Sequence, residues 1–132
     1  MPIPKWDNRV FLSVWVAKPR PVFSTPEQYQ ALLDTGATHS MITSDIVNQL
    51  SLPAIDRIVY SSASENEKET TRHLIRLNLD QASAGKDEFI IGVAKMAINP
   101  YYFQVLLGMD VLSFYEIKIS RGKLFLKRLL ST

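Results

Sequence analysis

Hydrophobic and polar positions alternate with a two-residue period over much of this chain, which is the period of β-strands. Between residues 74 and 79, Ile75, Leu77 and Leu79 alternate with polar Arg76 and Asn78. Other segments are short apolar runs rich in β-branched and aromatic residues, which is typical of buried strands. The predicted strands are 10–16, 74–79, 89–93, 103–107, 115–119 and 124–126.

Helical spacing is confined to short segments. In 44–50 the apolar residues fall three or four positions apart, Asp45 lies near the start and Pro53 follows the end, which predicts a short helix. A shorter helical turn is predicted over 109–113. The chain has neither an internal repeat nor a linker, so we expect a single domain spanning residues 1–132, all-β with one or two short helices.

Composition adds several exclusions. Hydrophobic residues make up 46% of the chain and charged residues 21%, so a single packed core is feasible. The lack of cysteine excludes disulfides, thiolate zinc sites and cysteine nucleophiles. No apolar run reaches the roughly 18 residues of a membrane helix, and no apolar stretch follows a basic start. We therefore expect no membrane partner and a cytoplasmic location.

The charge is nearly balanced but unevenly distributed. Fifteen basic and thirteen acidic residues give a net charge of +2, which is too small to indicate a nucleic-acid partner. Five basic residues and no acidic one lie between 118 and 128: Lys118, Arg121, Lys123, Lys127 and Arg128. The favoured interpretation is a solvated strand edge protected against aggregation, and phosphate binding is the alternative.

The segment 31–42 combines features of a catalytic site. Three apolar residues lead directly into Asp34, and the small, turn-forming residues Thr35, Gly36 and Ala37 follow. A carboxylate at the end of a buried strand is partly removed from water, which makes it a candidate acid or base. Glycine lets the backbone turn and approach another chain or a ligand closely. Asp-Thr-Gly alone is a weak signal, since chance produces it in about a few per cent of chains this long.

A second motif, two aliphatic residues and a glycine, lies about 70 residues further along. The two motifs are Asp34-Thr35-Gly36-Ala37 and Leu106-Leu107-Gly108. Together they resemble the active-site motif and the aliphatic-aliphatic-glycine motif of the retropepsin-like aspartic proteases, in the same order. The apolar pair and helix after the first motif are most similar to bacterial and cellular members. The resemblance covers most of residues 10–128 and implies a closed, barrel-like β lobe with a flap hairpin.

The resemblance also implies a reaction, the hydrolysis of peptide bonds. Two carboxylates about 3 Å apart share one proton, because both cannot be ionised cheaply. The ionised partner takes a proton from a bound water, and the protonated partner donates one to the scissile carbonyl. The chain holds one Asp-Thr-Gly, so the dyad requires Asp34 of two copies and hence a homodimer. The implied partners are a second copy and a peptide or protein substrate, without nucleic acid, cofactor or metal.

Further roles follow from the same resemblance. Thr35 would bond to its twin in the second copy, and Gly36 would offer its carbonyl to the substrate backbone. Ala37 completes the active-site loop. Thr38 and His39 are candidates for the substrate pocket.

The flap is expected as a hairpin over 59–71 with its tip near 63–67. Its candidate substrate-facing residues are Ser62, Ala63 and Ser64. Retroviral flaps are rich in glycine, whereas this segment contains none. The missing glycine motivates an alternative function, a non-catalytic module that keeps the fold and binds peptides or assembles with a partner.

A rival motif overlaps the first one. Residues 34–38 also fit the Asp-x-Gly-x-Thr phosphate loop of the actin and sugar-kinase superfamily. That superfamily needs two α/β domains and a much longer chain, so we favour the protease interpretation.

Overall fold

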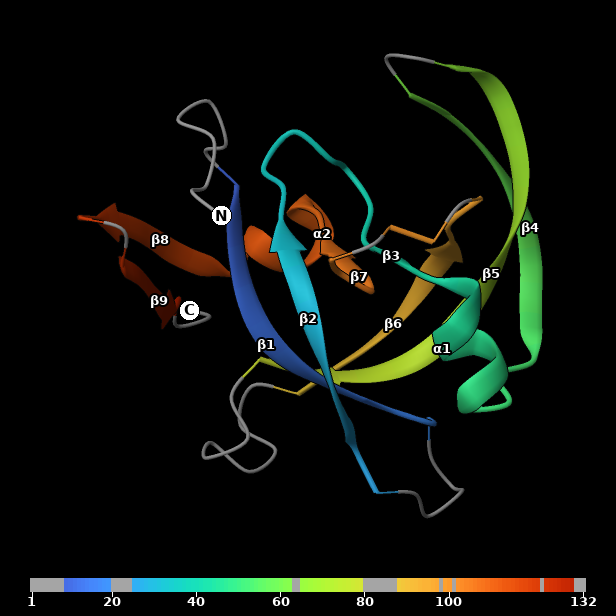
Figure 1. The fold of residues 1–132 in the computed structure, drawn as a ribbon, viewed down its shortest axis with the longest axis horizontal. Helices are drawn as coiled ribbons and strands as arrows, with labels where there is room; N and C mark the ends of the chain where they lie inside the picture. The colour runs from blue at the N-terminus through green and yellow to red at the C-terminus, as the bar shows by residue number, and fades with distance from the viewer. Residues whose placement is uncertain are drawn as a thin grey trace.

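The computed structural model describes residues 9–19, 25–62, 65–79, 88–97, 99–100, 102–121 and 123–129. Within these ranges the chain forms strands joined by short loops and two short helices (Figure 1). In chain order the elements are β1 (Val10–Ala17), β2 (Glu27–Leu33), β3 (Met41–Ile42), α1 (Ser44–Gln49), β4 (Ala54–Ser62), β5 (Glu65–Asn78), β6 (Glu88–Lys95), β7 (Val105–Leu107), α2 (Met109–Leu112), β8 (Tyr115–Ser120) and β9 (Lys123–Arg128).

Six strands close into a barrel. The sheet order is β1-β2-β7-β3-β6-β5-β4, and an additional pairing between β1 and β5 closes the ring, leaving β4 outside it. Closure comes from Val16 opposite Leu77, with the neighbouring residues in register. A closed ring leaves no unpaired edge except where β4 extends from β5. The all-β prediction with two short helices is confirmed.

The barrel interior is the hydrophobic core. Alternate residues of the strands point inward, so Val14 and Val16 of β1 and Ile75 and Leu77 of β5 are almost fully buried. Both helices contribute to the same cluster, α1 through Ile46 and α2 through Val111 and Leu112. The apolar residues of the two-residue pattern in the sequence are thus the ones that point into the barrel.

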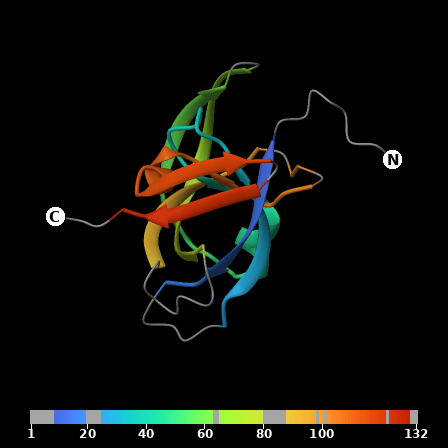
Figure 2. The same cartoon turned by 90° about the vertical axis from the view of Figure 1, so that its left-hand side faces the viewer.

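β4 and β5 form a long hairpin that continues past the barrel wall. Their antiparallel register runs from Ala54 opposite His73 to Ser62 opposite Glu65. The expected hairpin over 59–71 is present but longer, because the predicted strand at 74–79 is the second half of one continuous strand, β5. In Figures 1 and 2 the far end of the hairpin and the loop after β2 both lie towards the upper end of the barrel.

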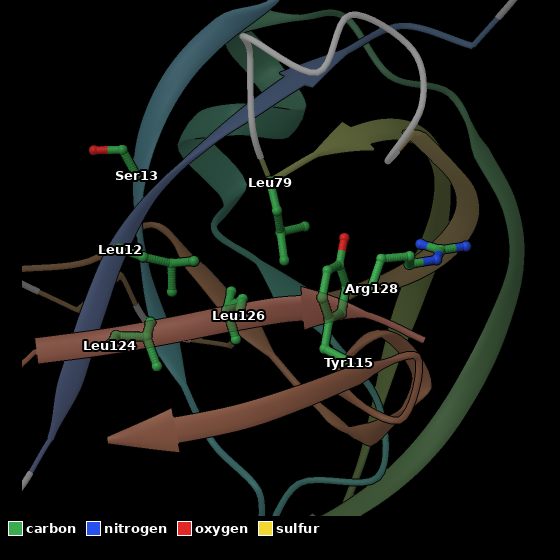
Figure 3. A pocket seen from close by; sticks show the side chains of 7 residues that line it. All are labelled: Leu12, Ser13, Leu79, Tyr115, Leu124, Leu126 and Arg128. Atoms are coloured by element: carbon green, nitrogen blue, oxygen red, sulfur yellow. The ribbon is translucent and has the colours of Figure 1, made fainter. Parts of the chain in front are cut away.

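The basic stretch of the sequence forms a separate two-stranded sheet, β8–β9, which lies across one side of the barrel (Figure 2). Its inner face is largely apolar: Tyr115 is buried, and Ile117 and Leu126 pack against the core cluster. A pocket of about 280 Å³ remains between this hairpin and β1. Figure 3 shows its apolar side chains turned towards one another; the lining residues are Leu12, Ser13, Leu79, Tyr115, Leu124, Leu126 and Arg128.

Neither helix of the described residues has the length and apolar character needed to cross a membrane.

Candidate active site

The topology of the barrel fixes where Asp34 lies. β7 is inserted between β2 and β3, parallel to the first and antiparallel to the second. The connection from β2 to β3, residues 34–40, must therefore cross over the end of β7. Asp34 is the first residue of this crossing, and its N–H donates to the Leu107 carbonyl at 3.0 Å. The two sequence motifs are thus brought together at one end of the barrel.

The Asp34 carboxylate is held on one side. The Gly36 N–H donates to Asp34 Oδ1 at 2.9 Å, and the Ala37 N–H donates to the Asp34 carbonyl at 3.2 Å. The side chain is half-buried, and Oδ2 accepts no hydrogen bond from any residue that the structure describes. One oxygen is therefore oriented by the loop, while the other can share a proton with a neighbouring acid or bind water.

Gly108 is required by the close crossing of the loop. A Cβ atom at this position would lie 2.7 Å from the His39 carbonyl carbon, 2.8 Å from the His39 oxygen and 2.9 Å from the Ala37 oxygen. All three are backbone atoms, which cannot rotate away as a side chain can. Two backbone hydrogen bonds hold the loop in this position, from the Met109 N–H to the Ala37 carbonyl at 2.8 Å and from the Asp110 N–H to the Thr38 carbonyl at 3.1 Å.

A pair that the sequence analysis did not identify, Ser40 and Asp110, anchors the far end of the loop. The Ser40 N–H donates to Asp110 Oδ2 at 3.0 Å, and the Ser40 hydroxyl donates to Oδ1 at 2.6 Å. The same hydroxyl accepts from the Gly108 N–H at 2.9 Å. Both carboxylate oxygens of Asp110 are therefore engaged. The residues lie 70 positions apart, and no spacing rule links them before the strand order is known.

The predicted site residues are distributed as follows. Thr35, Gly36, Thr38 and His39 are exposed on the loop surface, and Ala37 is half-buried against the segment that begins α2. Of the second motif, Leu107 and Gly108 are buried and Leu106 is half-buried. Ser62 is the last residue of β4, whereas Ala63 and Ser64 lie outside the described residues.

The hairpin is fastened to the barrel near its base. Arg72 on β5 donates to both oxygens of Asp56 on β4, from Nε at 2.9 Å and from Nη2 at 2.6 Å. These hydrogen bonds from Arg72 lower the pKa of the exposed Asp56 carboxyl below its ordinary value. The Thr70 hydroxyl donates to the Lys95 carbonyl of β6 at 2.7 Å. These contacts join β4 to β5 and β5 to β6 near the base of the hairpin.

Buried His73 ties the same base to the loop before β4. Its Nδ1 lies 3.1 Å from both the Leu52 and Pro53 carbonyl oxygens, so this nitrogen carries the proton. Its Nε2 lies 2.8 Å from the Thr71 hydroxyl. The ring therefore has a hydrogen-bonding partner at each nitrogen.

Residues 25–114 match the family of gag-polyprotein putative aspartyl proteases. The chain belongs to this family. The match begins just before β2 and ends just after α2, so it contains the loop of Asp34 and the glycine over which that loop crosses.

Solved structures give the same fold. The chain is similar to a retropepsin-like aspartic protease from Rickettsia conorii, with 20% identity, a TM-score of 0.55, and coverage of 89% of this chain and 92% of that one. It is also similar to the retroviral protease-like domain of Ddi1 from Leishmania major, with 16% identity, a TM-score of 0.51, and coverage of 91% and 90%. No match is found among curated proteins. These likenesses establish the retropepsin-like fold, and an all-β barrel is incompatible with the kinase phosphate-loop alternative.

Proposed function

We propose that this chain is an aspartic endopeptidase whose active site is completed by Asp34 from a second copy. The observation that carries the proposal is the state of the Asp34 carboxylate, with Oδ1 held by the Gly36 N–H and Oδ2 unbonded among the described residues. A second copy related by a two-fold axis would place an identical carboxylate opposite this oxygen. The pair would then hold one proton between them.

A second acid from the same chain is a weaker possibility. Asp110 is hydrogen-bonded to Ser40 at the end of the Asp34 loop, but both its carboxylate oxygens already accept from Ser40. An acid needed for proton transfer must have a free oxygen facing the substrate or water. Because Ser40 engages both Asp110 oxygens, the structure supports a symmetric homodimer over an active monomer.

In the proposed reaction the dyad acts on a bound water. One carboxylate removes a proton from the water as its oxygen attacks the scissile carbonyl carbon, and the other donates a proton to the carbonyl oxygen. The protonated carboxyl then donates its proton to the leaving nitrogen while a hydroxyl of the gem-diol returns a proton to the ionised carboxylate. The C–N bond breaks, a carboxylic acid and an amine are released, and the dyad again holds one shared proton. Exposed Thr35 would bond across to its twin, and Gly36 would offer its carbonyl to the substrate backbone.

The β4–β5 hairpin would act as the flap over the substrate. Its base is fixed by the Asp56–Arg72 pair and by the Thr70 hydroxyl, so movement would be confined to the far end. Residues 59–71 contain no glycine, which stiffens the backbone of such a segment. This feature also favours the second candidate, a peptide-binding module of the same fold that does not cleave.

Cleavage of a diverse peptide mixture between about pH 3 and pH 7 separates the two candidates, because a shared-proton dyad works on the acid side of neutrality. Wild type and Asp34→Asn would be compared by mass spectrometry, since the amide keeps the shape of the carboxyl but cannot exchange the proton. Cleavage by wild type alone is the expected result. A folded, dimeric wild type that cleaves nothing but retains peptides would instead identify the binding module.

A further inference from the structure

The five basic residues noted between 118 and 128 do not form one group in the structure. Arg128 faces the barrel, where its guanidinium carbon lies 4.3 Å from the ring centre of Phe89 and 5.1 Å from that of Phe114. The three lysines, Lys118, Lys123 and Lys127, are exposed. Arg128 therefore packs on the inner face of the hairpin, whereas the three lysines are open to solvent.

Strand register places the three lysines around a single aromatic ring. Lys118 is directly opposite Phe125 across the β8–β9 pair, and Lys123 and Lys127 lie two residues before and after it on β9. Residues two apart or directly opposite share a face of the sheet. Three of the five same-face neighbours of Phe125 within the hairpin are therefore lysines, and the two diagonal positions hold Glu116, opposite Lys127, and Ser120, opposite Lys123.

The ring is open to solvent and has space beside it. Phe125 is 52% exposed. A hollow of about 420 Å³ lies next to it, lined by Glu116, Lys118, Phe125, Leu126 and Lys127. None of the three lysines forms a salt bridge within the part of the chain that the structure describes. The lysines and the ring are therefore available to one ligand.

We propose that this outer face of the β8–β9 hairpin, defined by Lys118, Lys123, Phe125 and Lys127, binds single-stranded nucleic acid. An exposed aromatic ring offers a stacking surface to any base, and flanking lysines neutralise successive phosphates. Arg121, exposed at the turn between the strands, extends the positive charge. The small net charge led us to expect no nucleic-acid partner. The proposal departs from that expectation because binding depends on cations gathered on one face and not on the net charge of the chain.

The geometry favours a nucleic acid over an acidic peptide. β8 and β9 are hydrogen-bonded to each other, so their outer face presents side chains only and no main-chain N–H or C=O groups. Extended peptides gain much of their affinity from main-chain hydrogen bonds at a sheet edge, whereas bases stack on sheet faces. A second copy is also disfavoured, since two such faces in contact would bring lysines together.

Fluorescence anisotropy with a labelled ten-residue oligo-dT tests the proposal over a salt series starting at low ionic strength. Three neutralised phosphates predict a slope of about −2 for log affinity against log salt. Lys118→Gln should weaken binding and make the slope shallower by about 0.7, while Lys95→Gln, on β6, should leave both unchanged. Phe125→Leu should weaken binding at least about fivefold without altering the slope, because it removes stacking and no charge.

Several results would overturn the proposal. They are the absence of oligo-dT binding by folded wild type at low salt, equal effects of Lys118→Gln and Lys95→Gln, and unchanged affinity in Phe125→Leu. A ten-residue polyglutamate peptide that binds as tightly as oligo-dT would show that the face recognises negative charge alone. Lys118 and Phe125 are exposed and Lys95 is half-buried, and thermal unfolding of each variant verifies that the fold is kept. Oligo-dT binding should persist in Asp34→Asn, so failure of the nucleic-acid proposal is distinguishable from failure of the proteolytic function.

Discussion

Replacing Gly108 by alanine tests whether the crossing of the Asp34 loop over β7 is as close as the structure indicates. The added methyl would lie 2.7–2.9 Å from three backbone atoms of His39 and Ala37. Relief requires the loop to move away by roughly half an ångström or more, since carbon contacts are favourable only from about 3.5 Å. That movement stretches the backbone hydrogen bonds from Met109 and Asp110 to the loop.

The change in stability expected for Gly108→Ala is the sum of opposing effects. Overpacking a rigid site costs about 1–3 kcal/mol, and weakening two partly buried hydrogen bonds adds about 1 kcal/mol. The lower backbone entropy of unfolded alanine recovers about 0.5–1 kcal/mol. We therefore expect a net loss of about 1–3.5 kcal/mol in the free energy of unfolding, which lowers the melting temperature by about 4–13 °C for a domain of this size.

Gly92→Ala is the matched control. A Cβ at Gly92, in β6, would lie 3.5 Å from its nearest neighbours, which are guanidinium atoms of the flexible Arg72 side chain. We expect this variant to match wild type or to gain up to about 1 kcal/mol. Urea unfolding of the three proteins measures the difference. The proposed crossing geometry is refuted if the two alanine variants have equal stability within about 0.5 kcal/mol.

Three further predictions concern other parts of the structure. Asp110→Ala leaves the Ser40 N–H and hydroxyl without their acceptor and should cost about 2–4 kcal/mol in urea unfolding; a loss below 1 kcal/mol would contradict this anchor. Ser51 has a φ of 53° just after α1, so Ser51→Gly should raise stability by about 0.5–1 kcal/mol, and a decrease in melting temperature would show that the left-handed conformation costs nothing. The pKa of Asp56 is lowered in the folded protein by the Arg72 hydrogen bonds. The ionised Asp56 carboxylate therefore stabilises the fold at a pH above its ordinary pKa of 3.8, and this stabilisation is lost as the pH falls through the lowered pKa. The melting-temperature difference between wild type and Asp56→Asn should accordingly shrink as the pH falls from about 5 to 2, and a difference independent of pH would disprove the coupling.

The parts of the fold that the sequence predicted are those with one buried face. Residues 74–79 alternate because Ile75 and Leu77 point into the barrel while Arg76 does not. The first half of β5 was expected only as part of the hairpin that the family resemblance implies, because its residues carry almost no apolar side chains and show no alternating pattern. β7 was predicted over 103–107 and spans only Val105–Leu107, because Phe103 is buried outside the strand ladder.

The candidate site was predictable only where a motif is contiguous. The two motifs drew attention to Asp34 and to Leu106-Leu107-Gly108, and the structure joins them through the hydrogen bond from the Asp34 N–H to the Leu107 carbonyl. Asp110 lies in the first turn of α2 but does not cap it, since α2 has no side-chain cap, and the Asp110 carboxylate accepts from Ser40 instead. That contact depends on β7 lying between β2 and β3, a non-local arrangement that spacing along the chain does not encode.

Subunit mixing tests most directly the central claim that two Asp34 side chains form one active site. Wild type at a fixed concentration, high enough to be dimeric, would be refolded with increasing amounts of Asp34→Asn and assayed on a peptide that wild type cleaves. If random pairing leaves activity only in wild-type pairs, the rate should fall to about one half with equal variant and about one quarter with a threefold excess. A rate that stays constant at every ratio would contradict the shared site and place the catalytic groups within a single chain.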